Sequence, residues 1–229
     1  IEMAHVVGSP LVRIMTQKKE QILWGSNGAE KWNVAHGAWD TMAPMIAPAV
    51  ELARSEGVTL VVETGNGTMV NSNYTARRLI DELGAKDALK VLWDPANNCW
   101  CHERAYPEGY DEVRGGYLGH VHIKDVQVDT PRATLEIRPM GEGQLGPRFG
   151  DIAAGLRRDG YDGVISFESV YHPGNGDFEA GFRQNIGAFK ALFADATCYL
   201  ATVPTYAGGP MAFGWGTDGD ARQVDLAPL

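Results

Sequence analysis

Short apolar runs rich in β-branched residues alternate with longer stretches of helical periodicity up to residue 193. The short runs predict strands, and apolar residues spaced three or four apart predict helices. The predicted strands cover 6–14, 58–63, 89–94, 117–123 and 164–168. The predicted helices cover 38–56, 74–83, 107–114, 149–158 and 178–193. Pro44 and Pro48 interrupt the pattern of the first helix, so we expect its first half to be irregular.

Strands that alternate with helices predict a parallel sheet joined by right-handed crossovers. Four of the predicted strands end at polar side chains that can bind a metal ion: Glu63, Asp94, the pair His120 and His122, and Glu168. In a parallel barrel the C-terminal strand ends converge on one mouth, whereas an open sheet spreads them along an edge. The sequence therefore favours an α/β fold of the TIM (β/α)8 barrel type.

Two glutamates, one aspartate and one histidine form a donor set suited to a divalent metal ion with open positions for substrate. A glutamate at a strand end is commonly solvated, and an isolated histidine is commonly structural. These alternatives lose weight because all the polar positions recur at the same place in successive strand–helix units. We expect one divalent ion, with Mn²⁺ as the first choice and Mg²⁺, Co²⁺ or Zn²⁺ as alternatives. His120 and His122 share one strand face, and His122 lies nearer the C-terminal end.

Several motifs occur in a fixed order: V-V-E-T-G-N-G (61–67), W-D-P-A-N (93–97), G-H-V-H-I-K-D (119–125), P-M-G-E-G (139–143) and D-G-Y-D-G-V-I-S-F-E-S (159–169). Together they resemble the xylose-isomerase-like superfamily of sugar phosphate isomerases and epimerases. The resemblance implies that the metal ligands are Glu63, Asp94, His122 and Glu168, at the ends of strands five to eight. It also implies that Glu63 and Glu168 are catalytic and exchange protons with the substrate.

Five further residues are candidates for substrate binding. Lys124 shares the strand face of His122 and could stabilise a developing oxyanion. His120 is expected to support the site or the substrate rather than to bind the metal. Asn97 lies three residues beyond Asp94, where related epimerases often contact substrate. His102 and Arg138 are looser candidates, because surface loop residues would look the same.

The resemblance places strands four to eight on this chain, so residues 1–196 are expected to be the C-terminal part of a barrel domain. A sheet edge left open by absent strands favours association with other strands. We therefore expect either a further N-terminal segment or a partner chain, with an oligomer as one outcome. Residues 197–229 are rich in glycine and lack a sustained period, which predicts an irregular extension that packs in part on this chain or a neighbour.

Composition limits the remaining possibilities. The formal net charge of −9 disfavours a nucleic-acid partner, and no apolar run reaches the roughly 20 residues of a membrane helix. The three cysteines have no framework spacing, which indicates reduced thiols and a cytoplasmic protein.

We expect a metal-dependent sugar isomerase or epimerase that removes a proton next to a metal-bound carbonyl. A lyase of the same superfamily, either a dehydratase or a C-glycoside-cleaving enzyme, is the second hypothesis. The segment E-T-G-N replaces the more common E-N-H and leaves this choice open. A non-catalytic assembly subunit is the third hypothesis. A zinc-dependent endonuclease is disfavoured, because the net charge of −9 opposes DNA binding and six histidines are few for a site with several zinc ions. Sugar specificity is assigned to the loops 16–37 and 97–107.

Overall fold

The computed structural model describes residues 1–17, 37–65, 67–174 and 176–193, and the backbone of strands 197–202 and 210–216. The chain divides into two units, one made of Ile1–His122 with Val128–Glu136 and one made of Ile123–Gln127 with Ile137–Leu229. Most of the predicted specificity loop 16–37 lies outside the described residues.

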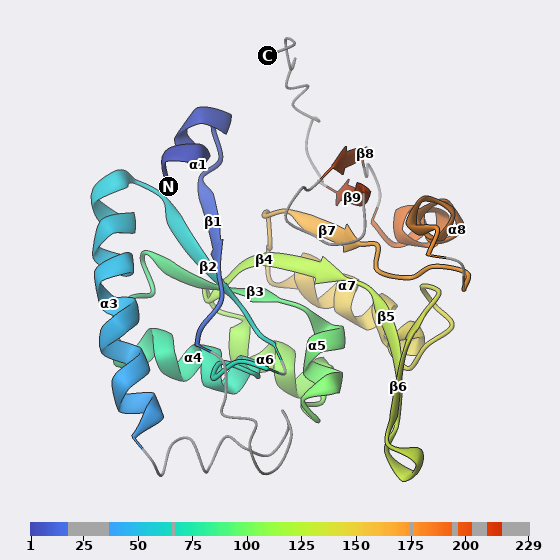
Figure 1. Ribbon diagram of the computed structural model, residues 1–229, viewed down its shortest axis with the longest axis horizontal. Coiled ribbons are helices and arrows are strands. Elements are labelled where there is room, and N and C mark those ends of the chain that lie inside the picture. Colours follow the sequence, from blue (N-terminus) through green and yellow to red (C-terminus); the bar gives the residue numbers. More distant parts are fainter. Residues whose placement is uncertain (18–36, 66, 175, 194–196, 203–209, 217–229) are drawn as a thin grey trace. The chain divides into compact units, whose positions relative to one another are not determined.

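The first unit is built on four parallel strands in the order β1-β2-β3-β4. Their bounds are β1 Leu11–Ile14, β2 Thr59–Glu63, β3 Leu89–Trp93 and β4 Leu118–Ile123, of which the last residue belongs to the second unit. The helices that the structure describes in this unit are α1 Glu2–Val7, α3 Ala38–Glu56, α4 Asn73–Glu82, α5 Pro95–Trp100 and α6 Tyr110–Val113. A π-helical turn, Ala105–Gly109, precedes α6. Helix α3 packs on β2 and helix α4 packs on β3, as Figure 1 shows.

Helix α3 follows the predicted range and buries one apolar face, formed by Trp39, Met42, Ile46, Val50 and Ala53. The prediction of an irregular first half is wrong, because a single helix is assigned across Pro44 and Pro48. Both prolines lie on the exposed face. There water can satisfy the carbonyl groups that lose a backbone partner, which lowers the cost of an internal proline.

The first predicted strand is shorter than its apolar pattern suggests. Val6 and Val7 end helix α1 and are largely exposed, and Gly8 closes this helix in the left-handed conformation with φ 67°. Only Leu11–Ile14 pairs with β2. The helix stops at Gly8 because a glycine takes this backbone conformation without a Cβ clash.

The second unit carries helix α7 Phe149–Arg158, strand β7 Ile165–Glu168 and helix α8 Phe178–Leu192. Helix α7 buries Phe149, Ile152, Ala153 and Leu156 at helical spacing. Helix α8 begins at Asp177, whose side chain accepts a hydrogen bond from the Ala180 amide at 2.9 Å. These elements fall where the sequence pattern predicts them.

The C-terminal extension is more regular than its glycine content predicts. Strands β8 Thr197–Thr202 and β9 Pro210–Gly216 form an antiparallel pair, and β9 also pairs antiparallel with β7. The extension thus contains two strands within a segment for which the sequence predicts no sustained period. The physical reason is that the edge of β7 offers a row of backbone N–H and C=O groups that a further strand can satisfy.

One pair of strands was not anticipated. Strands β5 Asp125–Asp129 and β6 Thr134–Arg138 form a separate two-stranded sheet directly after β4. A 3₁₀ turn, Thr130–Arg132, connects them.

Candidate metal centre

Glu63 is the last residue of β2 and is 3% exposed. Its two carboxylate oxygens have different neighbours. Oε2 forms an ion pair with the guanidinium of Arg13 on β1. Oε1 lies 3.4 Å from Asn97 Nδ2 and 3.5 Å from His122 Nδ1. The carboxylate is thus oriented from both sides.

Asp94 is fully buried at the point where β3 ends and helix α5 begins. Its Oδ1 accepts hydrogen bonds from the amides of Ala96 at 2.9 Å and Asn97 at 3.2 Å. Pro95 occupies the first helical position, where the missing N–H costs nothing. The sequence D-P-A-N therefore fixes the aspartate as an N-cap and starts the helix that carries Asn97.

His120 and His122 both lie on β4, with ring centroids 5.2 Å apart and the rings nearly perpendicular. Burial is the main cause that lowers the pKa of His120 to about 3, and the nearby His122 and Arg13 add to it. His120 is therefore a neutral imidazole at neutral pH. It stays a candidate for substrate support.

In the second unit, Glu168 is the last residue of β7 and is largely buried. Its Oε2 forms an ion pair with Lys124, whose side chain is 5% exposed. The neighbouring Asp125 accepts backbone hydrogen bonds from Val126, Gly141, Gly143 and Leu145. Lys124 thus meets a carboxylate, while Asp125 holds the loop that contains the P-M-G-E-G motif.

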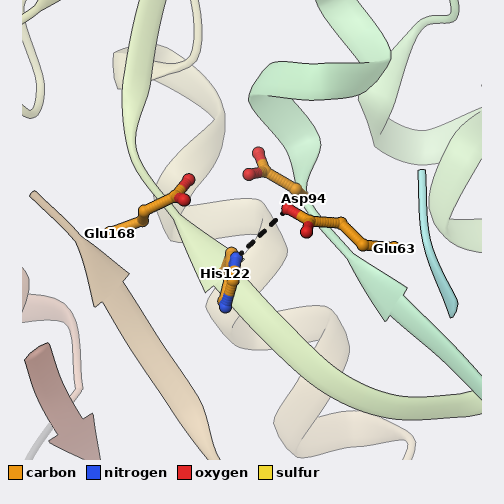
Figure 2. A group of neighbouring side chains, drawn as sticks. All are labelled: Glu63, Asp94, His122 and Glu168. Carbon is orange, nitrogen blue, oxygen red and sulfur yellow. Dashed lines mark ion pairs between the residues drawn. The ribbon is translucent and has the colours of Figure 1, made fainter. Parts of the chain in front are cut away.

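Glu63, Asp94 and His122, all in the first unit, could hold a metal ion, and their candidate ligand atoms lie within 4.8 Å of one another. Glu168, in the second unit, is the fourth candidate ligand. Figure 2 shows the side chains of Glu63, Asp94 and His122 pointing toward one another. The chemistry of the group fits a divalent ion, because three carboxylates and one imidazole are donors that Mn²⁺ and Mg²⁺ accept. Two ligands at about 2.1 Å from one ion lie about 3 Å apart at right angles. The 3.5 Å between Glu63 Oε1 and His122 Nδ1 is close to this spacing.

The remaining predicted residues differ in how closely they approach this group. Asn97 donates from Nδ2 to the Thr64 carbonyl at 2.8 Å and lies beside Glu63. His102 follows helix α5 with φ 60°, in an exposed loop. Arg138 ends β6. Neither His102 nor Arg138 belongs to the metal-binding group, and their contact with substrate stays a prediction.

Arg13 is the residue of this site that the sequence analysis missed. It is the charged residue in the otherwise apolar strand L-V-R-I, which is the signal that could have drawn attention to it. Its pairing position, level with Val61 on β2, was not visible in the sequence.

Residues 1–192 match the sequence profile of the family described as xylose isomerase-like TIM barrel. The chain belongs to this family. The match confirms the predicted fold class and the resemblance on which the ligand assignment rests.

Solved structures of xylose isomerase-like TIM-barrel proteins are similar to this chain in fold. A xylose isomerase-like TIM-barrel protein from Mycobacterium smegmatis, in complex with magnesium, superposes with a TM-score of 0.60 at 18% identity, over 83% of this chain and 63% of that one. A D-tagatose 3-epimerase-like protein gives 0.60 at 16% identity, over 83% and 66%. The chain thus spans slightly less than two thirds of these proteins, and the similarity shows the fold.

A curated relative of another kind matches a shorter stretch. A polyamine aminopropyltransferase of Ruegeria sp. (strain TM1040) is 43% identical over 95 residues, which is 40% of this chain and 31% of that enzyme. Within the part of the chain that the structure describes, no helix is long and apolar enough to cross a membrane.

Proposed function

We propose that this protein is a divalent-metal-dependent sugar isomerase or epimerase, with Glu63 and Glu168 as the carboxylates that move the substrate proton. The observation that carries the proposal is the group of three carboxylates and one imidazole at strand ends, in a chain of the xylose isomerase-like family. Manganese is the ion we place first. A keto-sugar or a related polyol is the substrate class.

The proposed chemistry assigns a role to each of these side chains. A divalent ion bound here would polarise a substrate carbonyl and an adjacent hydroxyl, which acidifies the carbon between them. Glu63 and Glu168 then exchange the proton at that carbon as general base and general acid. We assign Lys124, which pairs with Glu168, the role of balancing negative charge on the substrate oxygen, and Asn97 the role of holding Glu63 from the side.

A lyase remains the second candidate, because dehydration next to a carbonyl begins with the same proton abstraction. The donor set favours neither product. Aminopropyl transfer is not proposed, since the similarity to that enzyme covers 31% of its length. A non-catalytic assembly subunit is the alternative from another class, and it predicts no stoichiometric metal.

The test begins with metal content. The purified protein is stripped with a chelator and reloaded with Mn²⁺, and bound metal is measured by mass spectrometry. The loaded protein is then incubated with a panel of ketoses in D₂O, and deuterium at the carbon next to the carbonyl is measured by NMR. Exchange with a new epimer supports the epimerase, while an unsaturated product with release of water supports the lyase.

A matched pair of variants decides the role of the site. Glu168→Gln should abolish exchange, whereas Glu179→Gln, an exposed glutamate on α8, should leave it unchanged. Stoichiometric metal without exchange in any ketose would remove the isomerase proposal. Absence of metal would remove the metal centre as well.

Assembly and location are also proposals. We infer an oligomer, a small-molecule sugar partner without nucleic acid or membrane, and a cytoplasmic location. Size-exclusion chromatography with light scattering measures the assembly.

A further inference from the structure

We propose that Arg13 is a positioning residue that holds Glu63 through Oε2 and thereby presents Oε1 to the metal ion. The inference rests on the proposed metal centre and adds a residue outside the predicted ligand set. It concerns the first unit only, where Arg13, Glu63, Asn97 and His122 all lie.

The strand register places Arg13 on the face of the sheet that carries Glu63. Arg13 is level with Val61 on the adjacent parallel strand, and Glu63 lies two residues beyond Val61. Side chains alternate between the two faces of a strand, so Arg13, Val61 and Glu63 share one face. From this position the long arginine side chain reaches Glu63 at the end of β2.

The contacts then separate the two oxygens of Glu63. Arg13 Nη2 pairs with Oε2, while Asn97 Nδ2 and His122 Nδ1 lie beside Oε1. Rotation of the carboxylate out of this plane would move the oxygen away from the guanidinium and break the arginine pair. The guanidinium therefore selects one orientation of a buried side chain, which is what a supporting residue does for a ligating carboxylate.

Exposure makes this contact accessible to experiment. The Arg13 side chain is 37% exposed, whereas that of Glu63 is 4% exposed. A small cation from solvent can reach the space left by a shortened Arg13 side chain. This allows a rescue experiment that a residue buried in the core would not permit.

A positioning role and a purely electrostatic role predict opposite results. A positive charge beside a ligand repels a divalent cation, so removing it should tighten metal binding if charge alone matters. Loss of the contact that orients a ligand instead weakens metal binding, typically by 10 to 100-fold. The sign of the change in metal affinity therefore distinguishes the two roles.

The experiment measures Mn²⁺ dissociation constants by calorimetry for the wild-type protein and for Arg13→Ala, Arg13→Lys and Arg54→Ala. We expect Arg13→Ala to bind Mn²⁺ about 10 to 100-fold more weakly, with partial recovery when guanidinium ion is added at low millimolar concentration. Arg13→Lys should fall between, since an ammonium lacks the planar fork of donors. Arg54→Ala also removes an arginine–carboxylate pair, between α3 and Asp87, and should bind Mn²⁺ as the wild type does.

Failure of the positioning role of Arg13 can be distinguished from failure of the proposed metal centre. If the wild type binds Mn²⁺ and Arg13→Ala binds it equally or more tightly, the positioning role is overturned and the metal centre stands. If Arg13→Ala is weakened and Arg54→Ala is weakened equally, the loss is general and the positioning role is also overturned. If the wild type binds no divalent ion, both proposals fail. Metal affinity is read without any sugar, so failure to find the substrate does not affect the result.

Discussion

Glu63 and Glu168 are alike in sequence position and burial, yet the cations beside them differ. Each glutamate is the last residue of its strand, and each forms an ion pair inside its own unit. The guanidinium partner of Glu63 is 37% exposed, whereas the ammonium partner of Glu168 is 5% exposed. A partner that keeps part of its hydration is replaced by water at small cost, and a buried partner is not. For the free energy of unfolding, burial of the cation, rather than the presence of an ion pair, sets how much each glutamate depends on it.

The largest expected effect concerns the glutamates themselves. Glu63→Gln and Glu168→Gln should each lower turnover by about 100 to 10,000-fold, because each removes a proton-transfer group. The melting temperature should change far less, since strand-end side chains at a mouth do not build the core. Steady-state kinetics and thermal unfolding measure both quantities. Activity retained in either variant would show that the two carboxylates are not equivalent.

The next effect tests the buried ammonium. Lys124→Met should lower the free energy of unfolding of the metal-free protein by about 3–5 kcal/mol, because Glu168 is left buried without its counter-charge. Urea titration measures this loss. The double variant Lys124→Met with Glu168→Gln should recover much of it, since no carboxylate then remains to be compensated. We also expect the Lys124→Met variant to have a lower catalytic rate while its metal content stays intact. Loss of the metal in this variant would instead assign Lys124 a structural role.

A smaller loss of stability is expected when Arg13, the partly exposed cation beside Glu63, is replaced. Arg13→Met should lower the free energy of unfolding of the metal-free protein by about 1 kcal/mol, because water can approach Glu63 where the exposed guanidinium was. The same urea titration compares it directly with Lys124→Met. Equal losses in the two variants would contradict the conclusion that burial of the cation decides the dependence.

The smallest effect is expected at an ion pair far from the metal centre. The Arg54 guanidinium, through its hydrogen bonds, holds the pKa of Asp87 at about 2 instead of the ordinary 3.8. A lowered carboxyl pKa contributes stability that is present above about pH 4 and is lost as the pH falls toward 2. Arg54→Met should raise the pKa of Asp87 toward 3.8 and remove this acid-sensitive contribution. NMR titration of the Asp87 carboxyl group checks the direction, and an unchanged pKa would refute the assignment to Arg54.

The sequence by itself determined the elements that build the site. Helices 38–56 and 149–158 have the predicted bounds, because apolar residues at helical spacing need one buried face. The polar residues at or next to the ends of β2, β3, β4 and β7 were identified as one set, because a parallel α/β fold repeats the same strand-end position in each strand–helix unit. Local chemistry was sufficient there, as in the D-P-A-N segment that caps its own helix.

Only the tertiary structure decided which side chains meet. The register of β1 against β2 places Arg13 level with Val61, although helix α3 separates the two strands in the sequence. A shift of one residue would turn Arg13 to the other face and leave Glu63 without it. The pairing of Lys124 with Glu168 and of β9 with β7 likewise joins segments distant in sequence. Periodicity reports which face of an element is buried, whereas neighbours across strands are set by packing that no local pattern encodes.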